Sequence, residues 1–89
     1  MTGMIYDDKV KNRLKRIEGQ ARGILRMMEE ERTCGDVVHQ LTAIRAAVDR
    51  TIAYVIGNYM EQCIRDQVIK GENTEQAIQD AIALLTKSR

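Results

Sequence analysis

Apolar residues recur along the first third of the chain at alternating spacings of four and three positions. These residues are Val10, Leu14, Ile17, Ala21, Ile24 and Met28. Such spacing places them on one side of a helix, in a narrow stripe suited to a partner helix. Asp7 or Asp8 offers a side chain to cap the start, and the acidic residues 29–31 end the stripe. We expect a helix over residues 7–32.

A second apolar face follows with little interruption. It comprises Val37, Leu41, Ile44, Val48, Ile52, Val55 and Ile56. Thr33 or Cys34 is placed to cap this helix, and Asp36 in its first turn interacts well with the helix dipole. Gly57 is the only helix-disfavouring residue between Asp36 and Gly71. The pattern therefore predicts one long helix over residues 34–69.

A short third helix is expected after the loop at residues 71–73. Asn73 or Thr74, followed by Glu75 and Gln76, is typical of a helix start. The apolar positions that follow are Ala77, Ile78, Ala81, Ile82 and Leu85. We predict a helix over residues 74–87, and hence an all-α fold with two long helices and one short helix in a single domain, residues 1–89.

The composition agrees with helices and favours self-association. Proline, tryptophan and phenylalanine are absent from the 89 residues. A chain of this length buries only about 60% of the surface that its unfolded form exposes, so a lone core is marginal. There is no apolar stretch of membrane-spanning length and no secretory signal pattern, which predicts a soluble, cytoplasmic protein with reduced cysteines.

The two cysteines lie on one face of the predicted second helix but cannot meet within a chain. Cys34 and Cys63 are 63 − 34 = 29 residues apart, close to eight helical turns. The helical rise separates them by roughly 43 Å, whereas a disulfide needs Cα atoms within about 7 Å. Antiparallel pairing of two copies about a two-fold axis near Val48 and Asp49 places Cys34 of one beside Cys63 of the other. The geometry predicts a dimer with an antiparallel four-helix core.

The positions of the cysteines suggest different chemical roles. At the start of a helix, free backbone amides and the dipole favour a thiolate at Cys34, which makes it the candidate nucleophile. Cys63 suits the role of resolving thiol. Tyr59 shares their face but is a poor ligand for soft metals, so two thiolates remain for copper(I) or zinc. The alternative is that both cysteines are small buried hydrophobic residues.

The predicted first helix is strongly basic although the whole chain carries a net charge of only +1. From Lys9 to Arg26 the basic residues are Lys9, Lys11, Arg13, Lys15, Arg16, Arg22 and Arg26, against the single acid Glu18. Such asymmetry favours a nucleic-acid-binding face, with Gln20 as a possible base-reading group. Without interleaved aromatics, duplex phosphates fit better than single strands. The alternative is a solvated charged face. No catalytic grouping is present, so we do not expect an enzyme.

Three segments carry a family resemblance. The runs RLKRIEGQARGI over residues 13–24, CGDVV over 34–38 and QLTAI over 40–44 resemble the copper-sensing operon repressor family, which includes nickel and formaldehyde sensors. The resemblance covers nearly the whole chain. It implies a helical tetramer, a dimer of dimers, that represses an operon until its inducer binds. It also implies operator contacts at Arg13 and Arg50, with Lys15, Arg16, Gln20 and Arg22 as candidate assisting residues.

The resemblance also suggests the inducer. Copper sensors of the family use Cys, His and Cys at the positions of Cys34, Tyr59 and Cys63, so tyrosine here replaces the central ligand. The chain thereby looks like the persulfide-sensing branch, in which both cysteines remain and the histidine is absent. This implies release of DNA when persulfide or polysulfide cross-links Cys34 to Cys63 of another subunit, with no metal or cofactor. The alternative is a copper(I)-responsive repressor with the two cysteines as ligands.

Overall fold

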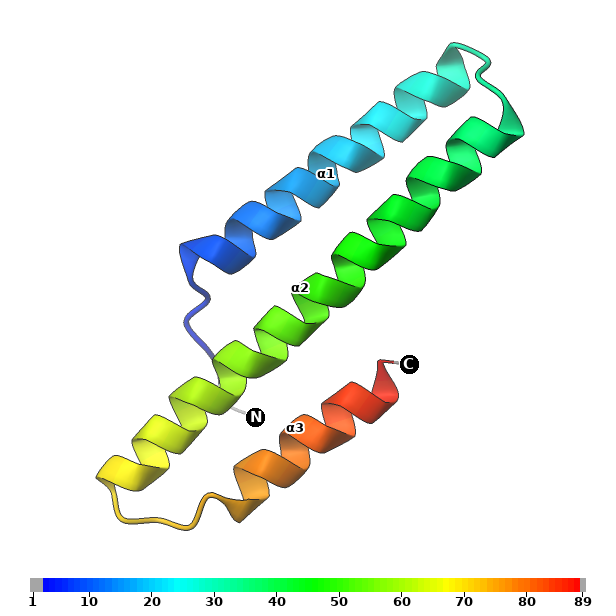
Figure 1. Ribbon diagram of the computed structural model, residues 1–89. Helices are drawn as coiled ribbons and strands as arrows, with labels where there is room; N and C mark the ends of the chain where they lie inside the picture. Colours follow the sequence, from blue (N-terminus) through cyan, green and yellow to red (C-terminus); the bar gives the residue numbers. More distant parts are fainter. Residues whose placement is uncertain (1–2, 89) are drawn as a thin grey trace. The chain divides into compact units, whose positions relative to one another are not determined.

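The computed structural model describes residues 3–88, and its regular structure is entirely helical (Figure 1). The helices are α1 (Asp8–Glu29), α2 (Cys34–Ile69) and α3 (Glu75–Lys87), and no strand occurs among the described residues. The predicted all-α fold is confirmed. Gly57 lies inside α2 and does not interrupt it, as the predicted antiparallel pairing requires. Within residues 3–88, no helix has the length and apolar character needed to cross a membrane.

The chain divides into two compact units. One unit is Asp7–Thr51, in which α1 runs beside the first part of α2 (Figure 1). The other joins the residues up to Tyr6 to those from Ile52 onward, and here α3 runs beside the last part of α2. In this second unit the Gln62 side-chain amide donates to the backbone carbonyl of Ile5 at 2.7 Å. The single domain over residues 1–89 stays a prediction, and residues 1, 2 and 89 lie outside the described part.

Side-chain hydrogen bonds show which of the predicted capping residues begin α1 and α2. Asp7 accepts a hydrogen bond from the backbone N–H of Val10 at 2.9 Å, so Asp7 rather than Asp8 caps α1. Thr33 accepts one from the N–H of Asp36 at 3.1 Å, which leaves Cys34 as the first helical residue of α2. Each such cap stabilises its helix by about 1 kcal/mol.

The end of α1 differs from the prediction: the helix stops at Glu29 rather than near Arg32. Glu31 adopts a left-handed conformation with φ of 58°, and the chain turns out of the helix. The N–H of Arg32 donates to the carbonyl of Met27 at 3.0 Å, and that of Glu31 to Met28 at 3.2 Å. This pair of hydrogen bonds satisfies the last carbonyls and closes the helix.

Few apolar side chains are buried within one chain. The buried apolar residues are Val10, Ile24, Ile56, Tyr59, Ala77 and Ala81. By contrast, Leu14 and Met28 on α1 are 60% and 52% exposed, and Leu41 on α2 is 47% exposed. Apolar residues left open in so small a chain favour burial between subunits. The predicted four-helix core of a dimer and the tetramer remain predictions.

Candidate functional site

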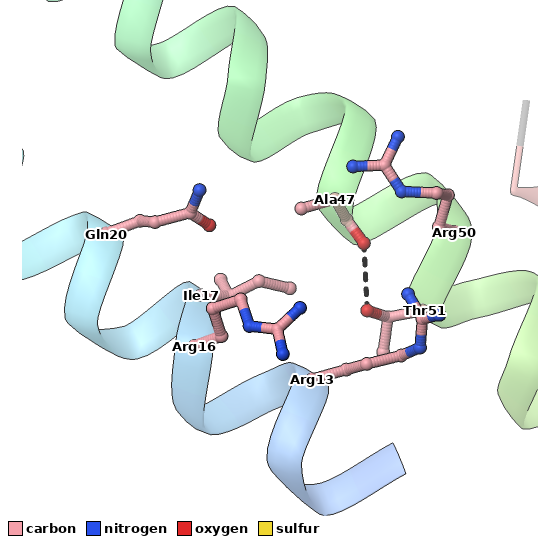
Figure 2. Close-up of a pocket in the computed structure, with 7 residues that line it drawn as sticks. All are labelled: Arg13, Arg16, Ile17, Gln20, Ala47, Arg50 and Thr51. Carbon is pink, nitrogen blue, oxygen red and sulfur yellow. Dashed lines mark hydrogen bonds between the residues drawn. The ribbon is translucent and has the colours of Figure 1, made fainter. Parts of the chain in front are cut away.

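Within the unit Asp7–Thr51, α1 and α2 form a small pocket of about 100 Å³ (Figure 2). Its lining residues are Arg13, Arg16, Ile17, Gln20, Ala47, Arg50 and Thr51. Figure 2 shows Arg13 and Arg16 extending from α1 toward α2, which contributes Arg50. We call this site the arginine pocket. It brings together four of the six residues expected from the sequence to contact DNA.

Helical spacing explains why these side chains meet. Arg13, Ile17 and Gln20 follow one another at steps of four and three along α1, so they share one side of that helix. Ala47 and Thr51 are separated by four residues on α2, and the Thr51 hydroxyl donates to the Ala47 carbonyl at 2.8 Å. Because this bond uses the hydroxyl proton of the buried Thr51, the other side-chain donors that line the pocket are the three guanidinium groups and the Gln20 amide.

The arginine pocket is electropositive. Three guanidinium groups line it, no carboxylate does, and arginine stays protonated in proteins. The forked N–H groups of a guanidinium match two oxygens of a phosphate or carboxylate. The Gln20 Oε1 atom is buried and has no hydrogen-bond partner among the described residues. The three guanidinium groups, and not the Gln20 oxygen, favour an oxyanion as an occupant of this pocket.

Two other predicted DNA-binding residues do not line the arginine pocket. Lys15 borders a separate hollow of about 250 Å³ together with Lys11, Leu14 and Glu18. The Arg22 guanidinium pairs with the Glu18 carboxylate at 3.2 Å, and both side chains are about two-thirds exposed. The structure thus separates Lys15 and Arg22 from the group formed by the other four.

A second polar cluster surrounds Tyr59 in the other unit. The Tyr59 side chain is only 8% exposed, and its hydroxyl donates to Oδ2 of Asp80 at 3.2 Å. Gln76 donates to Oδ1 of the same carboxylate at 2.9 Å, so both oxygens of Asp80 accept a hydrogen bond. Cys63, half-buried and one turn after Tyr59, is also hydrogen-bonded to the tyrosine hydroxyl. Tyr59 therefore links Cys63 to α3.

Sequence reasoning missed Asp80 and Gln76. Asp80 is 21 residues from Tyr59, beyond the loop that connects α2 to α3. The only local signal is that Gln76 and Asp80 are one turn apart, a spacing at which glutamine and aspartate side chains interact on a helix.

The environment of Tyr59 keeps its hydroxyl protonated. The pKa of Tyr59 is raised from 10.0 to about 12, most of all by burial, then by the hydrogen bond and charge of Cys63, and last by those of Asp80. A phenol that holds its proton is a poor metal ligand, because metals bind the ionised oxygen. Tyr59 is thus a protonated, hydrogen-bonding residue at neutral pH.

The raised pKa of Tyr59 predicts a loss of stability in alkali. The folded state holds the phenol proton more tightly than the unfolded chain, so this contribution is complete below pH 10 and disappears as the pH rises toward about 12. Urea unfolding across this range should show a fall in stability that is smaller in Tyr59→Phe. A parallel decline in both proteins would contradict the assignment.

The cysteines are both free thiols in the structure, but their surroundings differ. Cys34 is exposed at the first position of α2, whereas Cys63 is half-buried. No group of three or more His, Cys, Asp or Glu side chains that could hold a metal ion occurs in residues 3–88 of one chain. The single histidine, His39, is exposed on α2. Cys34 and Cys63 therefore offer two soft donors, which fit copper(I) better than nickel.

Comparison with known proteins places these sites in a family context. Residues 6–87 match a family described as metal-sensitive transcriptional repressor. The copper-sensing transcriptional repressor CsoR of Bacillus subtilis (strain 168) is 38% identical over 80 residues, which cover 90% of this chain and 78% of that protein.

Two solved structures are similar to the fold. The copper-sensing repressor CsoR with Cu(I) from Geobacillus thermodenitrificans NG80-2 has a TM-score of 0.75 and 28% identity, with 97% of this chain and 93% of that chain covered. The nickel-responsive transcriptional regulator InrS has a TM-score of 0.73 and 33% identity, with 98% and 97% covered.

Proposed function

The chain belongs to the metal-sensitive transcriptional repressor family, and from this membership we propose that it binds operator DNA and releases it when an inducer joins Cys34 to Cys63 of another subunit. The family is one of repressors and not of enzymes. The arginine pocket is the observation that carries the DNA-binding half. The inducer-binding half rests on the two free thiols at the positions described above.

DNA binding is proposed to centre on the arginine pocket. Three guanidinium groups in one pocket without a carboxylate suit a phosphate of the duplex backbone. Lys15 and Arg22 lie outside the pocket and assist by long-range attraction, which depends on salt. Phosphate contacts fix the position of the protein on the duplex, and Gln20 is the candidate for reading a base beside them.

Joining Cys34 to Cys63 is proposed to occur between subunits. The uninterrupted α2 helix supports this arrangement, because antiparallel pairing of two such helices aligns the first cysteine of one with the second of the other. The apolar residues that a single chain leaves exposed would be covered in the same dimer. Any ligand or bond that spans the two thiols then acts directly on the subunit interface.

Copper(I) is the inducer that the comparisons support better. CsoR of Bacillus subtilis and CsoR of Geobacillus thermodenitrificans are both named for copper sensing, and none of the three relatives is named for a sulfur inducer. Two thiolates are a soft donor set suited to copper(I). In this proposal Cys34 and Cys63 are the ligands and Tyr59 is not one.

Reactive sulfur is the second candidate, and the state of Tyr59 favours it. With this hydroxyl protonated and bonded to Asp80, the site lacks a third ligand. The Cys34 thiolate would attack a sulfane sulfur of a polysulfide, which forms a Cys34 persulfide and releases the shortened polysulfide. Cys63 of the partner subunit then attacks the Cys34 sulfur, forms a disulfide and expels hydrosulfide. The polysulfide is the two-electron oxidant in this sequence.

The test compares the two inducers on one DNA complex. A duplex selected from a random library by the reduced protein is titrated without oxygen with copper(I) or with inorganic polysulfide. We expect at least one of them to release the duplex, and Cys34→Ser to bind the duplex normally but to respond to neither. Intact mass spectrometry then separates a copper adduct from a covalent dimer. A Cys34→Ser protein that still responds would remove the proposed sensor.

A further inference from the structure

We propose that the arginine pocket is a discrete site for one tetrahedral oxyanion of the phosphate class, and that it binds free inorganic phosphate in the absence of DNA. The inference deepens the proposed DNA-binding site, because the same groups would hold a backbone phosphate. It does not require the chain to be a repressor, since the lining residues all lie within Asp7–Thr51 of one chain.

The pocket is large enough for one small anion. Its volume is about 100 Å³. The other lining residues, Ile17, Gln20, Ala47 and Thr51, carry no charge, so the charge that acts on an occupant comes from the three guanidinium groups. Their combined charge then favours phosphate over a monovalent ion such as chloride.

Gln20 provides a reason for choosing among oxyanions. Its Oε1 atom is a buried acceptor without a hydrogen-bond partner among the described residues, a condition that costs free energy until a donor arrives. This oxygen is closed off from water, so the Gln20 side chain must turn before an occupant of the pocket can reach it. Inorganic phosphate retains at least one proton at neutral pH and can then donate it to this oxygen, while its other oxygens accept from the arginines. Sulfate and the phosphodiesters of DNA have no such proton. Phosphate should therefore bind more tightly than sulfate.

The experiment is calorimetric titration of the reduced, DNA-free protein with sodium phosphate, at an ionic strength held constant with chloride. We expect saturable binding of one phosphate per chain and weaker binding of sulfate. Arg16→Ala should weaken phosphate binding about tenfold or more, because charge-assisted hydrogen bonds are lost. Arg16→Lys keeps the charge and the helix but loses the fork, so it should also bind less tightly.

Two further variants control for charge and for Gln20. Arg65→Ala removes an exposed arginine of α2 that pairs with Glu61 outside the pocket, and phosphate affinity should not change. Gln20→Leu should lower the phosphate affinity to that of sulfate. Absence of saturable phosphate binding, or equal losses in Arg65→Ala and Arg16→Ala, would overturn the proposal. Equal affinities of the wild-type protein for phosphate and sulfate would overturn the role given to Gln20.

A competition experiment tests whether the pocket binds free inorganic phosphate, a backbone phosphate of DNA, or both. The protein is bound to a duplex of random sequence, and phosphate is added at constant ionic strength. Displacement of the duplex beyond that caused by chloride supports one pocket for both phosphates. If phosphate binds saturably but does not displace the duplex, the pocket binds the free anion and does not hold a backbone phosphate of DNA. Duplex binding without phosphate binding overturns this inference and leaves the repressor proposal intact.

Discussion

Replacing Arg50 by alanine is expected to weaken binding to duplex DNA by about 10- to 100-fold. Arg50 is the arginine that α2 contributes to the pocket, opposite Arg13 and Arg16 of α1. Hydrogen bonds to charged groups contribute about 1.5–3 kcal/mol each, which corresponds to that loss in affinity. One phosphate contact fewer should also reduce the slope of log affinity against log salt by about 0.9. Fluorescence anisotropy over a series of salt concentrations measures both quantities.

Arg65→Ala is the matched control for Arg50→Ala. It removes the same charge from the same helix, but Arg65 lies outside the pocket and pairs with Glu61 four residues earlier. Such surface pairs contribute little to stability, so the fold should be unaffected. We expect near-normal affinity and an unchanged salt slope. If Arg50→Ala bound DNA like the wild type, or if both variants lost affinity equally, the arginine pocket would not be the centre of the DNA interface.

The two ends of the long helices explain which boundaries the sequence could predict. Gly71 has φ of 70°, and the N–H groups of Gly71 and Glu72 donate back to Val68 and Gln67. Glycine adopts that conformation without a steric penalty, so its presence predicted the end of α2. The same turn ends α1 with Glu31 in the left-handed position. Glutamate gives no signal there, and the predicted helix ran three residues too far.

The sites were predictable to the extent that helical spacing determined them. The step between Arg13 and Arg16 places both near one side of a helix, and the basic composition marked that segment in advance. Periodicity could not reveal that Arg50 lines the same pocket, because this depends on how α1 and α2 pack. The expectation that Arg50 contacts DNA came from the family resemblance. Asp80 was missed for the same reason: its contact with Tyr59 joins residues on different helices.

The residue at position 59 determines whether the two cysteines are joined by a third metal ligand. Its hydroxyl joins Cys63 on α2 to Asp80 on α3, and Gln76 holds the second oxygen of that carboxylate. A histidine in the same place could use one ring nitrogen as a metal ligand and donate the other N–H to Asp80. Carboxylates commonly orient metal-bound histidines in this way. Asp80 therefore already lies where it could orient a histidine at position 59, which in this chain is a tyrosine.

Tyr59→His is accordingly expected to raise the affinity for copper(I) by about tenfold or more, since losing even an outer partner of a metal ligand costs 10- to 100-fold. Competition with a copper(I) chelator, under reducing conditions, measures the change. Tyr59→Phe removes the hydroxyl without adding a ligand and should leave copper(I) affinity close to that of the wild type. Asp80→Asn in the Tyr59→His background should reverse part of the gain.

The same variants separate the two inducers. If copper(I) acts through two thiolates, the wild type, Tyr59→Phe and Tyr59→His should all release DNA with copper(I), the last at the lowest concentration. If reactive sulfur is the inducer, only Tyr59→His should gain a copper(I) response, while polysulfide acts on all three through Cys34 and Cys63. Equal copper(I) affinity in the wild type and Tyr59→His would contradict the view that the tyrosine limits metal binding, because the added imidazole would then supply nothing.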